Sequence, residues 1–297
     1  MKYNTLGSSD LSVSEVSFGC MSLNGSDQEN SQLLHQALER GINFFDTADL
    51  YDKGQNEETV GKAFRGKREQ VILATKVGNQ WRPDGSGWDW NPSKSYLLEA
   101  VNQSLRRLQT DYIDLYQLHG GTLEDPMDET IEAFELLKQQ GKIRHYGISS
   151  IRPNVIREYI NRSSMVSVMM QYSLLDRRPE EQVLDLLHQH QIGVLARGSL
   201  AQGLLLGKAP KPYLSHSAVE VTQTAEALKA IAGENHTQET SVRYVLHHPA
   251  VASAVIGIRT EAHLTQAIEA ASAPELEKET LEALKRQIPA GVYEQHR

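Results

Sequence analysis

Short apolar runs alternate with amphipathic stretches along nearly the whole chain. Each run is rich in β-branched or aromatic residues and is followed by a loop, which is typical of strands buried in a parallel sheet. The stretches between the runs have helical spacing, and Gly41 and Gly141 stand where two of these helices would end. The predicted strands are residues 16–19, 43–46, 71–76, 112–119, 143–149, 166–172, 193–196 and 251–258.

The order of strand, loop and helix repeats about eight times, which predicts a closed (β/α)8 TIM barrel. An open doubly wound sheet is the alternative, but its G-x-G-x-x-G signature is absent. Residues 6–13 predict an N-terminal β-hairpin, and no linker divides the chain, so we expect a single domain over residues 1–297. The predicted helices are one ending at Gly41, then 57–64, 93–108, 128–140, 154–161, 180–190, two helices ending near His248, 262–271, and a charged helix 275–288 packed outside or beneath the barrel.

Polar residues close the second, third and fourth of the predicted strands. Asp46 ends the second strand with Tyr51 just beyond it, Lys76 ends the third, and His119 ends the fourth. Barrel enzymes carry their chemistry at the C-terminal ends of the strands, so we expect these four side chains to meet there.

Such a set is suited to giving a proton to a carbonyl oxygen. Tyr51 would be the acid, and an ammonium at Lys76 would stabilise the phenolate that remains. Asp46 would hold Lys76, and His119 would donate to the substrate oxygen or relay the proton. Each residue also has a purely structural interpretation: a rim aromatic, a turn cap, a surface lysine and a core histidine. Their occurrence on adjacent strand ends favours the functional one.

Composition narrows the class of protein. The chain has 297 residues and a net charge of -8, which argues against a nucleic-acid partner because that would require a basic stripe. Cys20 is the one cysteine, so an internal disulfide or cysteine metal cluster is excluded, and we expect no bound metal. The N-terminus lacks the apolar core of a signal peptide, and no run approaches the roughly 18 apolar residues of a membrane helix. We therefore expect a soluble cytoplasmic protein with no membrane partner. The sequence does not indicate an oligomeric state.

The segment around Tyr51 resembles the signature of the aldo-keto reductases. The resemblance runs from Gly41 through Tyr51 to Gly54 and Glu57, and it extends to residues 6–21 and to 111–115 with His119. It covers essentially residues 6–271 and is closest to the bacterial NADPH-dependent oxidoreductases of the family. It implies a metal-free (β/α)8 barrel that reduces carbonyl groups with NADPH. By position, the catalytic tetrad of the family corresponds to Tyr51, Lys76, Asp46 and His119.

The same resemblance implies a nicotinamide site at the ends of strands five to seven. Ser149, Ser150 and Gln171 stand where the family has Ser-Asn and Gln, so Ser150 replaces the usual Asn. Tyr172 either helps to hold the nicotinamide or is a strand-end aromatic. The usual Tyr-Ser-Pro-Leu after strand seven is replaced here by a loop whose N–H groups would cradle pyrophosphate, with Arg197 adding a positive charge. The loop residues are Arg197, Gly198, Ser199, Leu200, Gln202 and Gly203, and they lack the Lys-Ser/Thr of a Walker loop.

The start of the last barrel helix is the expected site for the adenosine 2′-phosphate. Gly257, Arg259, Thr260 and His263 lie at this helix N-terminus, where backbone N–H groups favour an anion. Arg259 is alternatively a solvated arginine at a helix start. The Glu-Asn that the family usually has near the adenine is replaced by residues 266–267, so NADPH is favoured while NADH is possible.

The substrate side depends on loops. Residues 79–90 hold all three tryptophans, Trp81, Trp88 and Trp90, which would line an apolar pocket as a wall or lid, or fasten a long loop to the barrel. Met21 would add another wall. The main hypothesis is reduction of aldehydes or ketones. The alternatives are a regulatory or sensor subunit that binds the cofactor with little turnover, and a phosphate-binding barrel lyase or isomerase.

Overall fold

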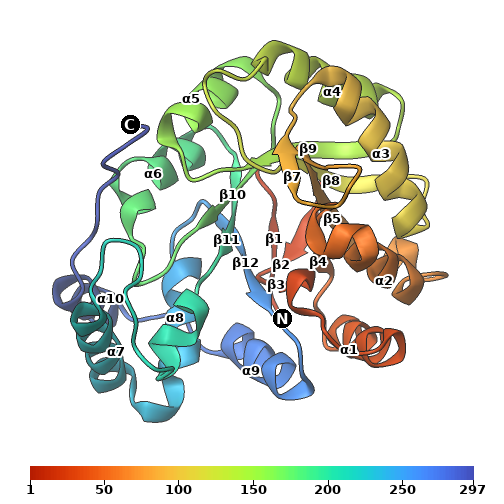
Figure 1. Ribbon diagram of the computed structural model, residues 1–297. Helices are drawn as coiled ribbons and strands as arrows, with labels where there is room; N and C mark the ends of the chain where they lie inside the picture. The colour runs from red at the N-terminus through yellow and green to blue at the C-terminus, as the bar shows by residue number, and fades with distance from the viewer.

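The computed structural model describes residues 1–297 and contains a closed barrel of eight parallel strands with helices around it (Figure 1). The final barrel strand pairs with the first, so no strand edge is left open. This confirms the predicted (β/α)8 barrel. In their order around the barrel the strands are β3 (Val16–Gly19), β4 (Phe44–Asp46), β5 (Ile72–Val77), β8 (Ile113–Leu118), β9 (Ile143–Ser149), β10 (Ser167–Gln171), β11 (Gly193–Arg197) and β12 (Val251–Gly257).

Ten α-helices accompany the strands, and several begin at residues that suit a helix start. Ser26 and Glu29 form a capping box at α1, Ser217 and Glu220 form one at α7, and the Ser93 hydroxyl accepts from the Tyr96 N–H at α3. The helices are α1 (Asp27–Glu39), α2 (Gln55–Ala63), α3 (Lys94–Leu108), α4 (Met127–Gln139), α5 (Pro153–Arg162), α6 (Val183–Gln189), α7 (Ala218–Ala232), α8 (Thr237–Leu246), α9 (Glu261–Ser272) and α10 (Lys278–Gln287).

Helix α6 is shorter than the predicted 180–190. Residues Arg178–Glu181 form a separate 3₁₀ turn, and the extended φ of -154° at Gln182 interrupts the chain before α6 begins. None of the helices has the length and apolar character needed to cross a membrane.

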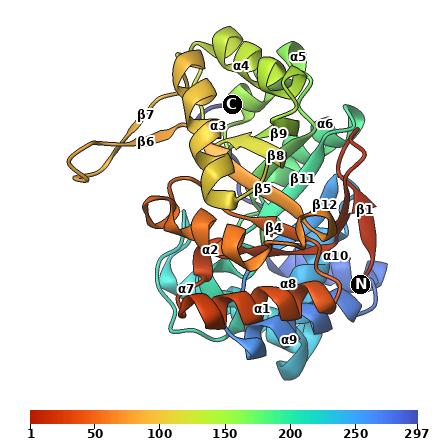
Figure 2. The same ribbon diagram turned by 90° about the vertical axis from the view of Figure 1, so that its right-hand side faces the viewer.

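The N-terminal hairpin closes one end of the barrel. Strands β1 (Tyr3–Thr5) and β2 (Ser12–Ser14) pair antiparallel, as the sequence predicts, and Leu6, Leu11 and Val13 pack with side chains of the barrel interior. A larger apolar cluster fills the space between the strands and the surrounding helices. Figure 2 shows β1 at one end of the barrel and the β6–β7 hairpin projecting from the other. The open end is therefore the one where the strands finish.

The tryptophan-rich segment after β5 is a second antiparallel hairpin rather than the expected irregular loop. Strands β6 (Asn79–Trp81) and β7 (Trp88–Trp90) pair directly, with Trp81 opposite Trp88. Cross-strand aromatic pairs of this kind stabilise hairpins, and residues 82–87 form the connection. The sequence prediction missed this pairing because aromatic strands this short are hard to distinguish from a loop.

Candidate active site

Lys76 lies at the centre of a compact polar group at the open end of the barrel. Its side chain is 1% exposed, and its Nζ donates to Asp46 Oδ2 at 2.7 Å, to the Thr47 carbonyl at 2.7 Å and to the Tyr51 hydroxyl at 3.2 Å. An ammonium has three hydrogens, and these three bonds use all of them. Because the Tyr51 oxygen accepts from Lys76, the hydroxyl hydrogen of Tyr51 is free to be donated elsewhere.

The turn that carries Tyr51 is tied to the barrel by its neighbours. The Thr47 hydroxyl donates to Asn56 at 2.6 Å, and the Asn56 amide donates to the Cys20 carbonyl at 2.8 Å. Asp52 and Lys53, directly after Tyr51, have φ values of 48° and 53°. Left-handed backbone at residues other than glycine stores strain of about 1–3 kcal/mol each and is common at functional sites. The turn therefore holds Tyr51 in a defined place.

His119 completes the group, as the sequence predicts. Its ring meets the Tyr51 ring edge-on at a centroid distance of 5.8 Å and an angle of 82°. Burial lowers the pKa of His119 to about 3, and the positive charges of Lys76 and Arg197 add to this effect. The imidazole is therefore neutral at physiological pH, and its Nδ1 is buried without a hydrogen-bond partner.

The Asp46–Lys76 pair keeps a positive charge beside Tyr51. Burial opposes the charged form of Lys76, but Asp46 and Tyr51 outweigh it and raise the pKa of the lysine. Burial also raises the pKa of Asp46, an effect that Lys76 counters. Both side chains are almost completely buried, so their mutual attraction is little screened by solvent.

The expected nicotinamide contacts lie around the same opening. The Gln171 amide accepts from Arg197 at 3.1 Å and donates to Asp176 at 3.0 Å, and the two strands pair Gln171 with Arg197 in register. Ser149 ends β9 and is half-buried. Ser150 is buried, and its hydroxyl accepts from the Arg152 N–H at 3.2 Å, so this hydroxyl already has one partner.

The loop after β11 turns sharply at the same end of the barrel. Gly198 has a φ of +73°, and a side chain there would press on Gln171. The hydroxyl of Ser199 is buried without a hydrogen-bond partner, whereas Leu200 is partly exposed and its carbonyl accepts from the Gly203 N–H. Gln202 and Gly203 both have left-handed φ values.

The last barrel strand leads into a helix start that is open to solvent. Gly257 has no side chain because a Cβ would lie 2.3 Å from the Ser22 hydroxyl. Arg259 is exposed and carries no ion pair. Thr260 caps α9 by accepting from the His263 N–H at 3.2 Å, while Nδ1 of the His263 ring is buried without a partner. Arg259 is therefore available to a ligand, whereas the Thr260 hydroxyl already serves the helix.

Tyr172 does not lie at the opening, which contradicts its expected contact with the nicotinamide. The side chain is fully buried, its hydroxyl donates to Glu180 at 2.9 Å, and its ring is tilted against Tyr244 at 6.1 Å. It belongs to the apolar cluster between the strands and the helices. The residue follows Gln171 directly and faces the other side of the barrel wall, because successive strand side chains point to opposite faces.

The four candidate pocket residues differ in environment. Trp90 anchors the hairpin: its indole N–H donates to Asp125 at 2.9 Å, and its ring covers Gly120, next to His119. Trp81 is half-buried under the Lys53 ammonium, which lies 5.2 Å from its ring centroid. Trp88 and Met21 are 46% and 67% exposed. The fastening role therefore applies to Trp90, and the exposed pair is available to a substrate.

One buried polar residue was missed by the sequence interpretation. Gln117 lies inside the barrel next to Lys76, and neither of its amide atoms has a hydrogen-bond partner. The signal in the sequence is a polar residue two positions before His119, in a predicted strand in which Asp114 is the other polar residue besides the tyrosines. Strand alternation places residues 117 and 119 on the same face.

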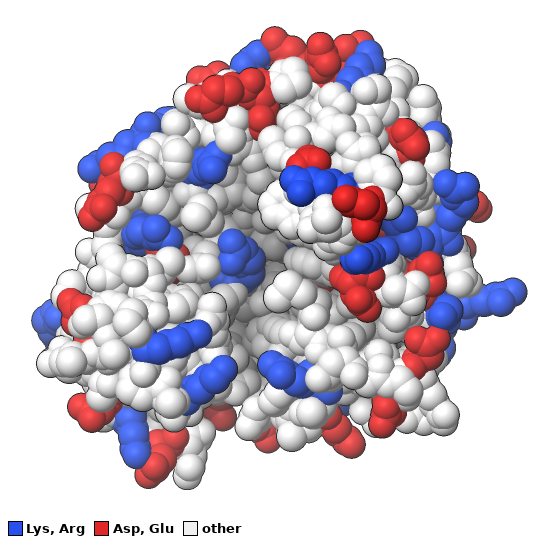
Figure 3. All heavy atoms as spheres, viewed as in Figure 1, with Lys and Arg blue, Asp and Glu red and all other residues white.

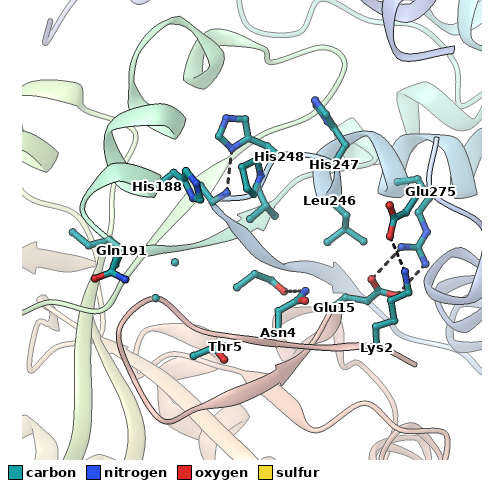
Figure 4. Close-up of a pocket in the computed structure, with 18 of the residues that line it drawn as sticks. Lys2, Asn4, Thr5, Glu15, His188, Gln191, Leu246, His247, His248 and Glu275 are labelled. Atoms are coloured by element: carbon teal, nitrogen blue, oxygen red, sulfur yellow. Dashed lines mark hydrogen bonds and ion pairs between the residues drawn. The ribbon is translucent and has the colours of Figure 1, made fainter. Parts of the chain in front are cut away.

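The two ends of the barrel differ. Viewed from the open end, the face is hollowed in the middle, with Lys and Arg side chains at the edge of the hollow (Figure 3). At the opposite end a cavity of about 540 Å³ lies beside β1 and the starts of β11 and β12. Its charged side chains are paired, Glu15 with Arg243 and Lys2 with Glu275 (Figure 4). Neither Lys76 nor its polar neighbours line this cavity.

A comparison with models of protein families finds a match over most of the chain. Residues 15–288 match the model of the aldo/keto reductase family. The chain belongs to the aldo-keto reductase family. As a member of it, the protein is an oxidoreductase of a family that acts on small carbonyl compounds with nicotinamide cofactors.

Curated relatives and solved structures agree with this assignment. The chain is 52% identical to the uncharacterised oxidoreductase YqkF of Bacillus subtilis over the full length of both, and 32% identical to the NADH-specific methylglyoxal reductase of Escherichia coli, covering 96% of this chain and 94% of that one. The holo form of aldo-keto reductase AKR11C1 from Bacillus halodurans is similar with a TM-score of 0.96 at 50% identity, covering 100% of this chain and 99% of that one. An aldo/keto reductase of Klebsiella pneumoniae with NADP and acetate has a TM-score of 0.81 at 28% identity, with the same coverage.

Proposed function

We propose that this aldo-keto reductase converts small aldehydes or ketones to alcohols with NADPH and uses Tyr51 as the general acid. The observation that carries the proposal is the 3.2 Å hydrogen bond from Lys76 to the Tyr51 oxygen, which leaves the hydroxyl proton free for a substrate. The bound nicotinamide would supply hydride to the carbonyl carbon. Side chains of the protein would carry out the proton transfer and the charge stabilisation.

The protein contributes proton transfer and charge stabilisation. As the carbonyl oxygen becomes an alkoxide, Tyr51 gives it a proton, and the neighbouring Lys76 ammonium stabilises the phenolate left behind. Asp46 keeps Lys76 charged and in place. The neutral His119 ring lies beside Tyr51 and would donate an N–H to the same substrate oxygen. The proton that Tyr51 loses is regained from solvent after the alcohol leaves.

The residues around the opening fit a nicotinamide dinucleotide. Gln171 and Ser149 would hold the carboxamide, and the loop 197–203 would hold the pyrophosphate, where the buried Ser199 hydroxyl lacks a partner. Arg197 is exposed beside that loop and adds positive charge. Exposed Arg259 would bind the 2′-phosphate at the start of α9, with His263 beside it. The Klebsiella relative holds NADP and the Escherichia coli relative is NADH-specific, so the relatives differ in cofactor. In this chain the preference for NADPH would rest on Arg259.

The test is consumption of NADPH, with NADH in parallel, in the presence of a panel of small aldehydes and ketones. We expect Tyr51→Phe to lower kcat by about 10²- to 10⁴-fold, the usual contribution of a general acid, while the Kd for NADPH changes little. Tyr3→Phe is the matched control, because the Tyr3 hydroxyl donates to the Gly41 carbonyl at the other end of the barrel. Near-normal turnover by Tyr51→Phe would show that the acid is another group.

The cofactor panel separates the remaining possibilities. Arg259→Ala should weaken NADPH binding about tenfold or more and leave NADH binding unchanged, because NADH has no 2′-phosphate. Equal use of both cofactors by the wild-type enzyme would remove that role from Arg259. Tight cofactor binding without turnover on any carbonyl would favour the sensor alternative, for which the replacement of the family Asn by Ser150 leaves room.

A further inference from the structure

Gln117 is a buried amide that the proposed mechanism does not use. It is fully buried inside the barrel, and both Nε2 and Oε1 lack a hydrogen-bond partner. Buried side-chain amides in folded proteins are nearly always hydrogen-bonded, because leaving one unpaired costs free energy. A site at which both atoms of the amide remain free therefore needs a physical reason.

The strand register places Gln117 beside the catalytic group. Parallel pairing aligns Gln117 with Lys76 on one side and with Gly147 on the other. Leu115, two residues earlier, packs in the barrel interior, whereas Tyr116 packs outward against Phe134 of α4. By strand alternation the Gln117 side chain points into the barrel at the level of Lys76.

Asp46 presents the complementary atom. Its Oδ2 accepts from Lys76, but its Oδ1 is buried without a partner. Gln117 aligns with Lys76, and Lys76 bonds Asp46, so the amide and the carboxylate both lie next to this lysine. In this structure neither Asp46 Oδ1 nor the Gln117 amide has a hydrogen-bond partner, and the amide counters the burial-induced rise in the pKa of Asp46. A carboxylate oxygen only accepts hydrogen bonds, so the group that faces it must be the amide N–H.

Ser167 supplies a partner for the other end of the amide. It aligns with Gly147, and its hydroxyl lies 2.3 Å from the position that a Cβ on Gly147 would occupy. The hydroxyl thus fills the place of the missing side chain next to Gln117, and it too is buried without a partner. A hydroxyl can donate to the amide oxygen, which leaves the amide N–H for Asp46.

We propose that Gln117 is a positioning residue for the Asp46–Lys76 pair, with its amide N–H donating to Asp46 Oδ1 and its amide oxygen accepting from Ser167. This role rests on the proposed function, because it acts through Lys76 on the acid Tyr51. The amide fixes the plane of the carboxylate, so that Oδ2 meets the ammonium and the third lysine hydrogen remains directed at Tyr51. Without it the carboxylate can rotate and Lys76 loses its fixed place.

The kinetic test is Gln117→Leu, which keeps the approximate volume and removes both polar atoms. We expect kcat to fall by about 10- to 100-fold, the scale on which small misplacements of catalytic groups act. KM and the Kd for NADPH should change less than about threefold, since the proposed role of Gln117 is to hold Asp46 and not to bind either ligand. The acid limb of the kcat profile should also move to higher pH, because Asp46 loses a donor that favours its ionised form.

Two comparisons separate positioning from a general loss of packing. Tyr116→Phe is the matched control on the same strand. It removes a different buried polar group, a hydroxyl that also lacks a partner but faces the helices. It should leave kcat and its pH profile unchanged. In an Asp46→Ala background, Gln117→Leu should cost little further kcat, because that variant has no side-chain oxygen left to accept from the amide N–H. Additive losses in the double variant, or an unmoved acid limb, would overturn the proposal.

A measurement without turnover distinguishes this proposal from the proposed function. In urea unfolding of the cofactor-free protein, Gln117→Leu should lower the midpoint more in the wild-type background than in Asp46→Ala, which has no side-chain oxygen to accept from the amide. That coupling depends only on contact between the two side chains. If this coupling were found in a protein without turnover, the reductase function would be refuted and the contact between Gln117 and Asp46 would stand. Independent midpoint shifts would refute the contact even in an active enzyme.

Discussion

The positive charge of the site depends on the ammonium group of Lys76. With its three hydrogens bonded to Asp46, Thr47 and Tyr51, it has no capacity left for a substrate. We therefore propose that it sets the properties of Tyr51 and neutralises Asp46. The two functions can be separated because Asp46 lies on β4 and Tyr51 lies on the following turn.

Replacing Lys76 by Met should affect both activity and stability. The variant leaves Asp46 buried without its counter-charge, which costs about 3–5 kcal/mol when one partner of a buried ion pair is removed. We also expect kcat to fall by about 10²- to 10⁴-fold, because the acid loses the cation beside it. Urea unfolding and NADPH consumption measure the two effects. The double variant Lys76→Met, Asp46→Asn should recover part of the lost stability but none of the activity, and recovery of activity would contradict this assignment.

His119 should respond to pH in a way that its position explains. Its pKa is about 3 in the folded protein against about 6.5 in an unfolded chain, so the unfolded state takes up the proton first. The stability associated with the neutral ring is complete above pH 6.5 and declines as the pH falls from 6.5 toward 3. His119→Gln lacks this proton uptake and should lose less stability than the wild type over the same interval. Urea unfolding at pH 7 and at pH 4.5 checks the difference between the two proteins.

Nuclear magnetic resonance gives an independent check on the same ring. The His119 resonance, identified by its absence in His119→Gln, should stay constant from pH 8 to pH 5. A midpoint near 6.5 for His119 would show that the ring is solvated and not held neutral by its surroundings.

At the residue scale, the sequence predicted correctly the positions of polar residues that lie at the ends of adjacent strands. Asp46, Lys76 and His119 could be placed because each closes an apolar run, and the structure brings them together with Tyr51. Tyr172 could not be placed correctly, because a one-residue step along a strand exchanges the inner and outer faces. Their catalytic and cofactor roles stay predictions until the variants are measured.

At the element scale, the β6–β7 hairpin differs most from the expectation. The sequence showed three tryptophans between glycines but did not show that Trp81 and Trp88 pair across two strands. Its base is fastened by Trp90 over Gly78 and Gly120, and its tip is met by Lys53 at the Gly85 carbonyl. The hairpin thus connects the strand end next to His119 with the turn that follows Tyr51.

Two tryptophan variants should separate fastening from exposure. Trp90→Ala removes a half-buried ring and its hydrogen bond to Asp125, so we expect a loss of about 2–4 kcal/mol, somewhat less than for a fully buried Trp. Trp88→Ala removes a largely exposed ring and should change stability by less than about 0.5 kcal/mol. If Trp88 contacts the substrate, this second variant should raise KM while leaving stability unchanged. Equal destabilisation by both would show that Trp90 is not the anchor.

At the scale of the whole molecule, the closed barrel was predictable, but the covering of one of its ends by the N-terminal hairpin was not. The count of strand and helix units is read from periodicity, and this led to the correct fold. The sequence also indicated the N-terminal hairpin but not that it packs into the barrel. Contacts between residues far apart in the chain, such as Leu11 with the interior strands, leave no local pattern.

The closing hairpin leads to the expectation that the chain unfolds as one unit. Leu11 is almost completely buried among the barrel interior side chains, so Leu11→Ala should cost about 2–5 kcal/mol, whereas Val219→Ala, at a 66% exposed position on α7, should cost less than about 0.5 kcal/mol. Because the inner cluster joins the hairpin to strands from both halves of the barrel, neither half has a complete core of its own. Fluorescence and circular dichroism should therefore report one coincident transition in both variants, as a single domain over residues 1–297 requires. Fluorescence and circular dichroism transitions that do not coincide in Leu11→Ala would show instead that the hairpin end and the tryptophan end of the barrel unfold separately.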